Sequence, residues 1–103
     1  MTINVANVTT AGNIAYASTG NTAITYFALC NYSASNVTAN VFVVPSGQTP
    51  GNTNALVNNL TIQANDTYFL YIAAEKLLLG NGDSVQASAN ANTVTSTTSY
   101  TTI

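Results

Sequence analysis

The amino-acid sequence predicts an all-β protein, a single antiparallel β-sandwich that is either jelly-roll-like or immunoglobulin-like. Segments with strand propensity recur about every eight to twelve residues, separated by Asn, Gly, Ser and Pro, which is the spacing of sandwiches and barrels. Apolar residues at helical spacing are nearly absent. The 103 residues, 47% of them hydrophobic, are enough for one domain with a modest core. We therefore expect about eight or nine short strands in one domain over residues 1–103.

The individual strands follow from runs of β-branched, aromatic and aliphatic residues between turn-forming residues. Residues 1–20 are expected to form either an N-terminal arm or an edge strand. The expected strands cover residues 2–8, 13–18, 22–31, 36–44, 55–63, 67–73, 76–79, 83–90 and 93–102.

Two of these segments, 22–31 and 36–44, carry apolar residues on both faces, which predicts central strands covered on both sides. Simple alternation in the first segment puts Phe27 and Leu29 on one face and Ile24 on the other. The segment 93–102 is mostly Thr and Ser, so its inner face is weak, and we expect partner chains to complete its burial.

Turn-forming residues predict the loops. The longest, 45–54 ("PSGQTPGNTN"), is expected to project from the fold. Asn65 and Asp66 are expected to form a turn. The stretch "GNGD" at 80–83 predicts a hairpin between the strands on either side of it, and the segment beginning at residue 73 could open with a single helical turn.

Charged residues make up only 4% of the chain, with one Lys and no His. Nucleic-acid binding requires several cationic side chains to displace counterions from phosphates, and a basic membrane-surface helix requires them as well. No apolar run approaches the roughly 18 residues that span a bilayer, and the first residues lack the pattern of a secretory signal. We therefore expect no nucleic-acid partner, no membrane partner and no signal peptide.

The sequence offers few of the residue types that catalysis uses. Without His, the Ser-His-Asp, Cys-His and His-metal arrangements are excluded. Asp66, Glu75 and Asp83 could in principle serve glycoside hydrolysis or a calcium site, but turn formation already explains Asp66 and Asp83. Cys30 is expected to be a small buried apolar residue. The sequence therefore predicts a protein that is not an enzyme, with no catalytic residues, no cofactor and no metal.

The scarcity of charge favours assembly. Free soluble domains usually guard their edge strands with charged residues or proline, and this chain has a single Lys for all its edges. We expect a homo-oligomer, with a trimer favoured, or a lattice-bound subunit. A few charges can fix the register of such contacts. The residues expected to form the interface are Ser46, Gly47, Gln48, Thr49, Pro50, Gly51, Asn52, Glu75, Lys76, Asn81 and Asp83.

A carbohydrate-binding module is the competing class. Aromatic side chains in exposed turns can stack on sugar rings, and Tyr32 beside the turn "NYSASN" is the best-placed candidate for a glycan contact.

Four short motifs follow one another along residues 19–103: Cys30 with Asn31 at a strand end, "VPSG" at 44–47, "KLLL" at 76–79, and "NGD" at 81–83 before alternating small residues. In this order they resemble the small virion structural proteins of tailed bacteriophages of the type that infects marine bacteria and cyanobacteria. The resemblance implies a β-sandwich that decorates or cements the capsid, or that serves in the neck, tail or fibre. It further implies the major capsid or tail proteins as partners, and a location in the virion after assembly in the bacterial host cytoplasm.

Overall fold

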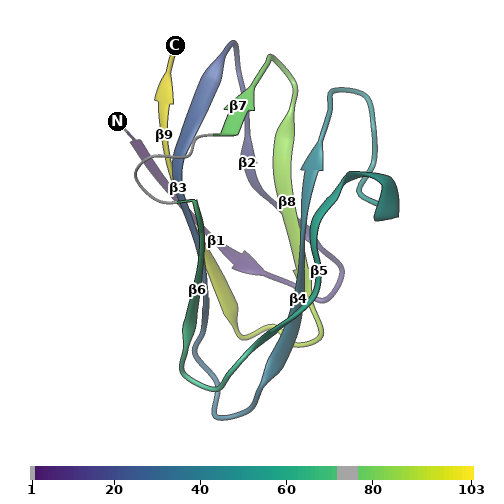
Figure 1. The fold of residues 1–103 in the computed structure, drawn as a ribbon, viewed down its shortest axis with the longest axis vertical. Coiled ribbons are helices and arrows are strands. Elements are labelled where there is room, and N and C mark those ends of the chain that lie inside the picture. Colours follow the sequence, from purple (N-terminus) through teal and green to yellow (C-terminus); the bar gives the residue numbers. More distant parts are fainter. Residues whose placement is uncertain (1, 72–76) are drawn as a thin grey trace.

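The computed structural model describes residues 2–71 and 77–103 of the chain. The protein is all-β, as predicted, and the nine strands found in these residues form two antiparallel sheets that pack face to face (Figure 1). The elements are β1 (Thr2–Val8), β2 (Asn13–Ala17), β3 (Thr22–Asn31), β4 (Val37–Val44), the 3₁₀ turn η1 (Asn52–Asn54), β5 (Ala55–Ile62), β6 (Thr67–Tyr71), β7 (Leu77–Leu79), β8 (Ser84–Ala89) and β9 (Val94–Thr102).

The strand order decides between the two sandwich types. The five-stranded sheet has the order β1-β9-β3-β6, with β7 also paired to β3, and the four-stranded sheet has the order β2-β8-β4-β5. Along the chain, β1 therefore pairs with β9, β2 with β8, β3 with β6 and β7, and β4 with β5, as in one long hairpin that is folded over into two sheets. This arrangement is a jelly roll, in which β6 and β7 together occupy the place of one edge strand.

Tight turns in this fold mostly join the two sheets. The turn at 80–83 forms as predicted, but the predicted hairpin is wrong, because β7 pairs with β3 in one sheet while β8 lies in the other. A turn motif in the sequence predicts that the chain reverses direction. It does not predict to which sheet each flanking strand belongs. The helical turn considered for the segment beginning at residue 73 falls mainly on residues 72–76, outside the described residues. In the part of the chain that the structure describes, no helix is long and apolar enough to cross a lipid bilayer.

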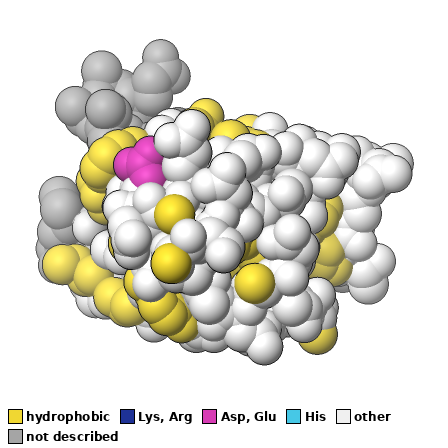
Figure 2. All heavy atoms as spheres, turned by 90° about the horizontal axis from the view of Figure 1, so that it is seen from below, with side chains coloured by type: hydrophobic (Ala, Val, Ile, Leu, Met, Phe, Trp, Pro, Cys, Tyr) yellow, Lys and Arg dark blue, Asp and Glu magenta, His cyan; other side chains and the backbone are white. Residues whose placement is uncertain are grey.

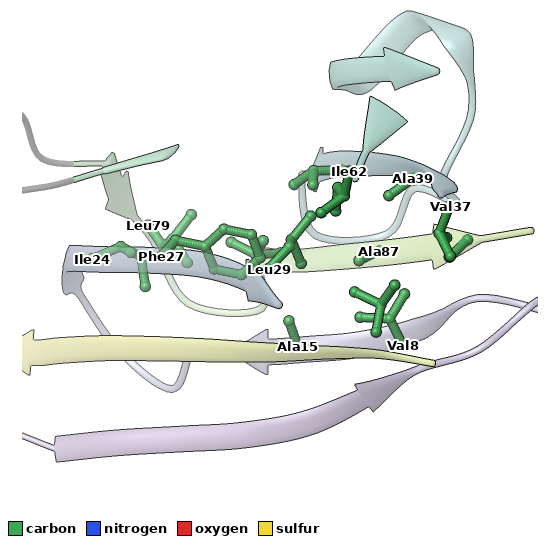
Figure 3. Packing of buried hydrophobic residues seen from close by; sticks show 14 residues of the cluster. Val8, Ala15, Ile24, Phe27, Leu29, Val37, Ala39, Ile62, Leu79 and Ala87 are labelled. Carbon is green, nitrogen blue, oxygen red and sulfur yellow. The ribbon is translucent and has the colours of Figure 1, made fainter. Parts of the chain in front are cut away.

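The core lies between the sheets and draws on most of the strands (Figure 3). Each large apolar side chain that is fully buried there contributes about 1.5–3 kcal/mol. As predicted, β3 and β4 are central strands of their sheets, but the prediction that both of their faces are covered is wrong, because the other sheet covers only one face of each. The core residues include Val8, Ala15, Ile24, Phe27, Leu29, Val37, Ala39, Val41, Ile62, Leu79, Val85, Ala87 and Val94.

Ile24 corrects the predicted facing of β3. It belongs to the core together with Phe27 and Leu29, although simple alternation would place it on the opposite face. The register of β3 against β9 shifts between Ile24 and Tyr26, and this irregularity turns the strand so that both halves present apolar residues inward. Cys30 was expected to be buried, but it is only half-buried and does not belong to the core.

The inner face of β9 is also better buried than predicted. Val94, Ser96 and Thr98 are each fully buried within the chain itself. β9 lies between β1 and β3, and the small side chains of Ser96 and Thr98 face the core, so this inner face needs no partner chain for burial. Ser96 Oγ donates to the Ala6 carbonyl at 3.3 Å, whereas Thr98 Oγ1 has no hydrogen-bond partner among the described residues.

Candidate assembly interface

Loops gather at the two ends of the sandwich (Figure 1). One end, here called the Asp83 end, comprises residues 18–21, 45–54 and 80–83. The other, called the Asn31 end, comprises residues 9–12, 32–36, 63–66 and 90–93. The predicted interface residues that the structure describes all lie at the Asp83 end, whereas Tyr32 lies at the Asn31 end.

The carboxylate of Asp83 joins the two segments that were predicted separately. Its Oδ1 accepts a hydrogen bond from the Ser46 backbone N–H at 2.9 Å. Its Oδ2 accepts one from the Gly80 N–H at 2.9 Å and so closes its own turn. The start of the 45–54 loop is therefore fixed to the 80–83 turn by one half-buried side chain.

The 80–83 turn is also fixed to the β2–β3 connection. Asn81 Oδ1 accepts a hydrogen bond from the Gly20 N–H at 2.9 Å. The backbone of Ser18 bonds to both Gly82 and Asp83, at 3.0 and 2.8 Å. Gly82 has a φ of +87°, a conformation that L side chains rarely adopt, and a Cβ there would lie 2.5 Å from Ser46 Oγ. Glycine is thus required at this position both by its backbone angle and by the contact with Ser46.

Beyond Ser46 the long loop is exposed yet internally bonded. Gly47, Gln48, Thr49, Pro50 and Asn52 are exposed, and Gly51 is half-buried. The Asn54 side chain holds the loop together, since its Nδ2 donates to the Thr49 carbonyl at 2.9 Å and its Oδ1 accepts from the Gly51 N–H at 3.0 Å. The loop therefore presents a neutral surface that is already ordered within the chain.

The charged residues are distributed differently from the prediction. Glu75 and Lys76 lie outside the described residues. Asp83 uses both carboxylate oxygens for bonds within its own chain, so turn formation accounts for it. Asp66 lies at the opposite end, where Oδ1 accepts from the Thr67 N–H at 2.8 Å in the predicted turn. Asp83 was predicted to contribute a charge to the interface, but a substitution there would also remove the bonds that hold the loops.

Tyr32 has an exposed ring and an occupied hydroxyl group. The side chain is 54% exposed. Its hydroxyl lies 3.0 Å from the Asn92 carbonyl oxygen and 3.2 Å from Asn7 Oδ1, and these two acceptors share its one hydrogen. The ring face is accessible for stacking, but the hydroxyl already serves to fix the 32–36 loop to its neighbours.

Asn31 organises the end at which Tyr32 lies, and sequence analysis missed this role. Its side chain is fully buried. Nδ2 donates its two hydrogens to three carbonyls, those of Ser35, Ile62 and Gln63, at 2.8, 3.1 and 3.2 Å, so that one hydrogen is shared. Oδ1 accepts from the N–H and hydroxyl of Ser33 and from the hydroxyl of Thr93, at 3.1, 2.9 and 3.4 Å. Because the chain is rich in Asn, nothing in the sequence distinguishes this one beyond its position at the end of an apolar strand.

The outer surface of the five-stranded sheet is a second feature that the sequence did not single out. Ile3, Val5, Phe69 and Leu78 are between 52% and 66% exposed. Cross-strand register places Val5, Thr97, Ala28 and Phe69 in one row over β1, β9, β3 and β6. We call the outer surface formed by Ile3, Val5, Tyr26, Phe69 and Leu78 the neutral face.

The residues between these apolar side chains are Thr and Ser of β9, opposite Val5 and Ile3. The charged residues that the structure describes are Asp66 and Asp83, and both lie in end loops. Seen from the Asn31 end, the surface is likewise composed mainly of neutral polar and hydrophobic atoms, with one small acidic patch (Figure 2). The neutral face can therefore form apolar and hydrogen-bonded contacts but no ionic contacts through its described residues.

Metal ligation is not indicated by the described residues. Over residues 2–71 and 77–103, no group of three or more His, Cys, Asp and Glu side chains is placed to hold a metal ion. Comparison with protein-family models, curated protein sequences and solved structures yields no match to this chain.

Proposed function

We propose that this protein is a non-enzymatic structural subunit of a tailed-phage virion that decorates or cements the capsid through multivalent contacts. The neutral face is the observation that supports the proposal, together with the motif order that resembles such virion proteins. A location in the neck, tail or fibre is the alternative, and it would use the same surface. The partners would then be the major capsid or tail proteins.

The neutral face carries exposed apolar residues on several strands and no charge among its described residues. Exposed apolar side chains that gather on one face, with polar residues between and around them, often mark an interaction site. Here Val5 and Phe69 lie in one row, with Tyr26 and Phe69 in edge-to-face contact at a centroid distance of 6.0 Å. Many copies, each with modest contacts, bind strongly to a particle because the second and later contacts become effectively intramolecular. Such contacts should depend little on salt, because they include few charges.

The test is to replace the native chain by a variant in the virus and to count copies per purified virion by quantitative mass spectrometry. Phe69→Lys places a charge in the neutral face and should lower the copy number by about tenfold or more. Ile14→Lys is the matched control, because Ile14 is 53% exposed against 52% for Phe69 but lies on the other sheet. It should leave the copy number unchanged. Equal incorporation of both variants would contradict the proposal.

A second candidate is recognition of neutral host glycans, and a groove on the outer side of the four-stranded sheet favours it. The groove has a volume of about 390 Å³ and is lined by Phe42, Pro50, Gln86 and Ser88 among others, none of them ionisable. An aromatic ring beside amide and hydroxyl groups suits a sugar ring, which has an apolar face and a hydroxyl edge.

Glycan-array binding separates this candidate from the first and locates it. Loss of binding on Phe42→Ala would assign it to the groove, whereas loss on Tyr32→Ala would assign it to the Asn31 end. Absence of binding to any neutral glycan by the native protein would reject the candidate.

A further inference from the structure

The two open sheets of the sandwich have four edges, and they are protected to very different degrees. The edges of the five-stranded sheet are β1 on one side and β6 with β7 on the other. The edges of the four-stranded sheet are β2 and β5. An edge strand exposes unpaired backbone N–H and C=O groups, and natural proteins usually protect these with charges, proline, bulges or short strands.

Three of the four edges carry such protection. β2 has only five residues, its register shifts between Ile14 and Tyr16, and the Ala15 carbonyl accepts a hydrogen bond from the Asn4 side chain. β5 pairs with β4 through two register shifts, and Asn59 within it has a φ of +54°. β6 and β7 are five and three residues long, and β6 has a further shift against β3.

β1 carries none of these devices. All seven of its residues pair with β9 in one unbroken register, from Thr2 opposite Tyr100 to Val8 opposite Val94. It contains no proline, no charged residue and no residue with a positive φ. Ile3 and Val5, on its outward side, are 66% and 61% exposed. Among the described edge strands, β1 is thus the longest one with an unbroken register, and it has none of the features that hinder pairing with another strand.

We propose that β1 pairs with β1 of a second copy of this chain, antiparallel about a two-fold axis, so that the two five-stranded sheets become continuous. The proposal rests on the assembly function proposed above and specifies one of its contacts. Two identical antiparallel strands are self-complementary, because every residue pair i with j recurs as j with i across the axis. The unpaired backbone groups of one copy then meet those of the other at regular spacing.

The side chains of β1 and its lack of charge also favour a second copy of this chain as the partner. The outward residues Ile3 and Val5 of both copies would lie side by side on the joined sheet, where neighbouring apolar side chains stabilise the pairing. No charge on β1 opposes the approach of an identical strand. A partner must itself offer a flat, neutral and unpaired edge of comparable length, and a second copy of this chain does so. The resulting particle is a dimer and not the trimer expected from composition.

The test uses the full chain in sedimentation equilibrium over a concentration series, with hydrogen exchange measured on the same samples. The native protein should form a dimer in which the amides of 2–8 become more protected as concentration rises. Val5→Lys and Val5→Glu should each weaken the dimer by about tenfold or more, because like charges would meet near the axis. An equimolar mixture of the two variants should restore the dimer, and this restoration should fade at high salt.

Ile14→Lys is again the control, since it adds the same charge to an exposed apolar residue on the protected edge β2, at 53% exposure against 61% for Val5, and it should leave the dimer intact. A native protein that stays monomeric, a dimer that survives Val5→Lys, or a trimer with unprotected β1 amides would each overturn the inference. The proposed function would still stand in any of these cases if Phe69→Lys lowered incorporation into virions, so the two failures are distinguishable.

Discussion

At each end of the sandwich one polar side chain holds the loops together, and the two ends use different side chains. At the Asn31 end a fully buried amide bonds to backbone groups of the 32–36 loop and of the β5–β6 connection. At the Asp83 end a half-buried carboxylate bonds to the N–H groups of Ser46 and Gly80. In each case one side chain joins segments of neighbouring loops, and it adds to direct backbone bonds such as the one from the Asn65 N–H to the Ser33 carbonyl.

The difference between the ends follows from burial. An amide has donors and acceptors, so Asn31 can satisfy carbonyls with Nδ2 and N–H or hydroxyl donors with Oδ1 without a charge in a dry site. An ionised carboxylate only accepts hydrogen bonds and is costly to bury, so it suits the Asp83 end, where N–H groups converge and solvent still reaches the side chain. A chain with few charges can therefore still hold long loops, provided that its polar side chains bond to the backbone.

The largest effect should come from Asn31→Ala. It would remove the bonds to the carbonyls of Ser35, Ile62 and Gln63 and leave buried polar groups without partners. The free energy of unfolding should fall by about 3 kcal/mol, measured by denaturant titration. Asn36→Ala, which removes one exposed bond to the Ala64 N–H at the same end, should cost about 1 kcal/mol or less. Equal losses would show that burial does not distinguish the two amides.

The Asp83 end can be tested through its tightest contact. Gly82→Ala should lower the free energy of unfolding by about 2 kcal/mol, because the new Cβ combines a positive φ with a close approach to Ser46 Oγ. Gly20→Ala is the control, since Gly20 also has a positive φ but no atom within 4 Å of the added Cβ. The difference between the two variants measures how firmly the 45–54 loop is pressed onto the turn; no difference would mean that Ser46 moves freely.

A smaller loss is expected when the carboxylate itself is removed. Asp83→Ala should cost about 1.5 kcal/mol, because two bonds from backbone N–H groups are lost where solvent can replace them in part. Asp66→Ala at the other end loses a single exposed bond and should cost about half as much. Thermal unfolding followed by circular dichroism would measure both, and a larger loss for Asp66 would reverse the ranking of the two carboxylates.

The smallest effect should have the opposite sign. Between the two ends, the hydroxyl of Thr98 is fully buried and has no partner among the described residues. Thr98→Val should raise the free energy of unfolding by up to about 1 kcal/mol. Ser96→Ala, on the same inner face, should instead lower it by a similar amount, because Ser96 Oγ bonds to the Ala6 carbonyl. A loss of stability in both variants would indicate that Thr98 is satisfied by water.

Much of the fold could be predicted from the sequence because strands and turns are local. The expected segment 22–31 coincides with β3, and the turns at 63–66 and 80–83 form where Asn, Asp and Gly predict them. Sheet membership could not be predicted, because a tight turn joins strands of one sheet or of two equally well. The position of Ile24 could not be predicted either, because a bulge changes the face of a strand without a reliable residue signature.

The candidate surfaces were less predictable than the fold. The segments around Ser46 and Asp83 were both selected for their turn residues, and the structure brings them together. The neutral face was missed because a strand such as β3 has apolar residues on both sides, so its pattern does not say which side is outward. The role of Asn31 was missed because its partners belong to segments far away in the sequence.

The position of β9 between β1 and β3 has a consequence for biosynthesis. Because β1 leaves the ribosome before β9 and, among the described strands, pairs only with β9, the five-stranded sheet cannot close until residues 94–102 have been translated. Until then β1 and the inner residues of β3 remain available for wrong partners, and pairing over such sequence distances is slow. Nascent chains stalled before Val94 should therefore depend on chaperones, whereas chains released after β9 can fold on their own.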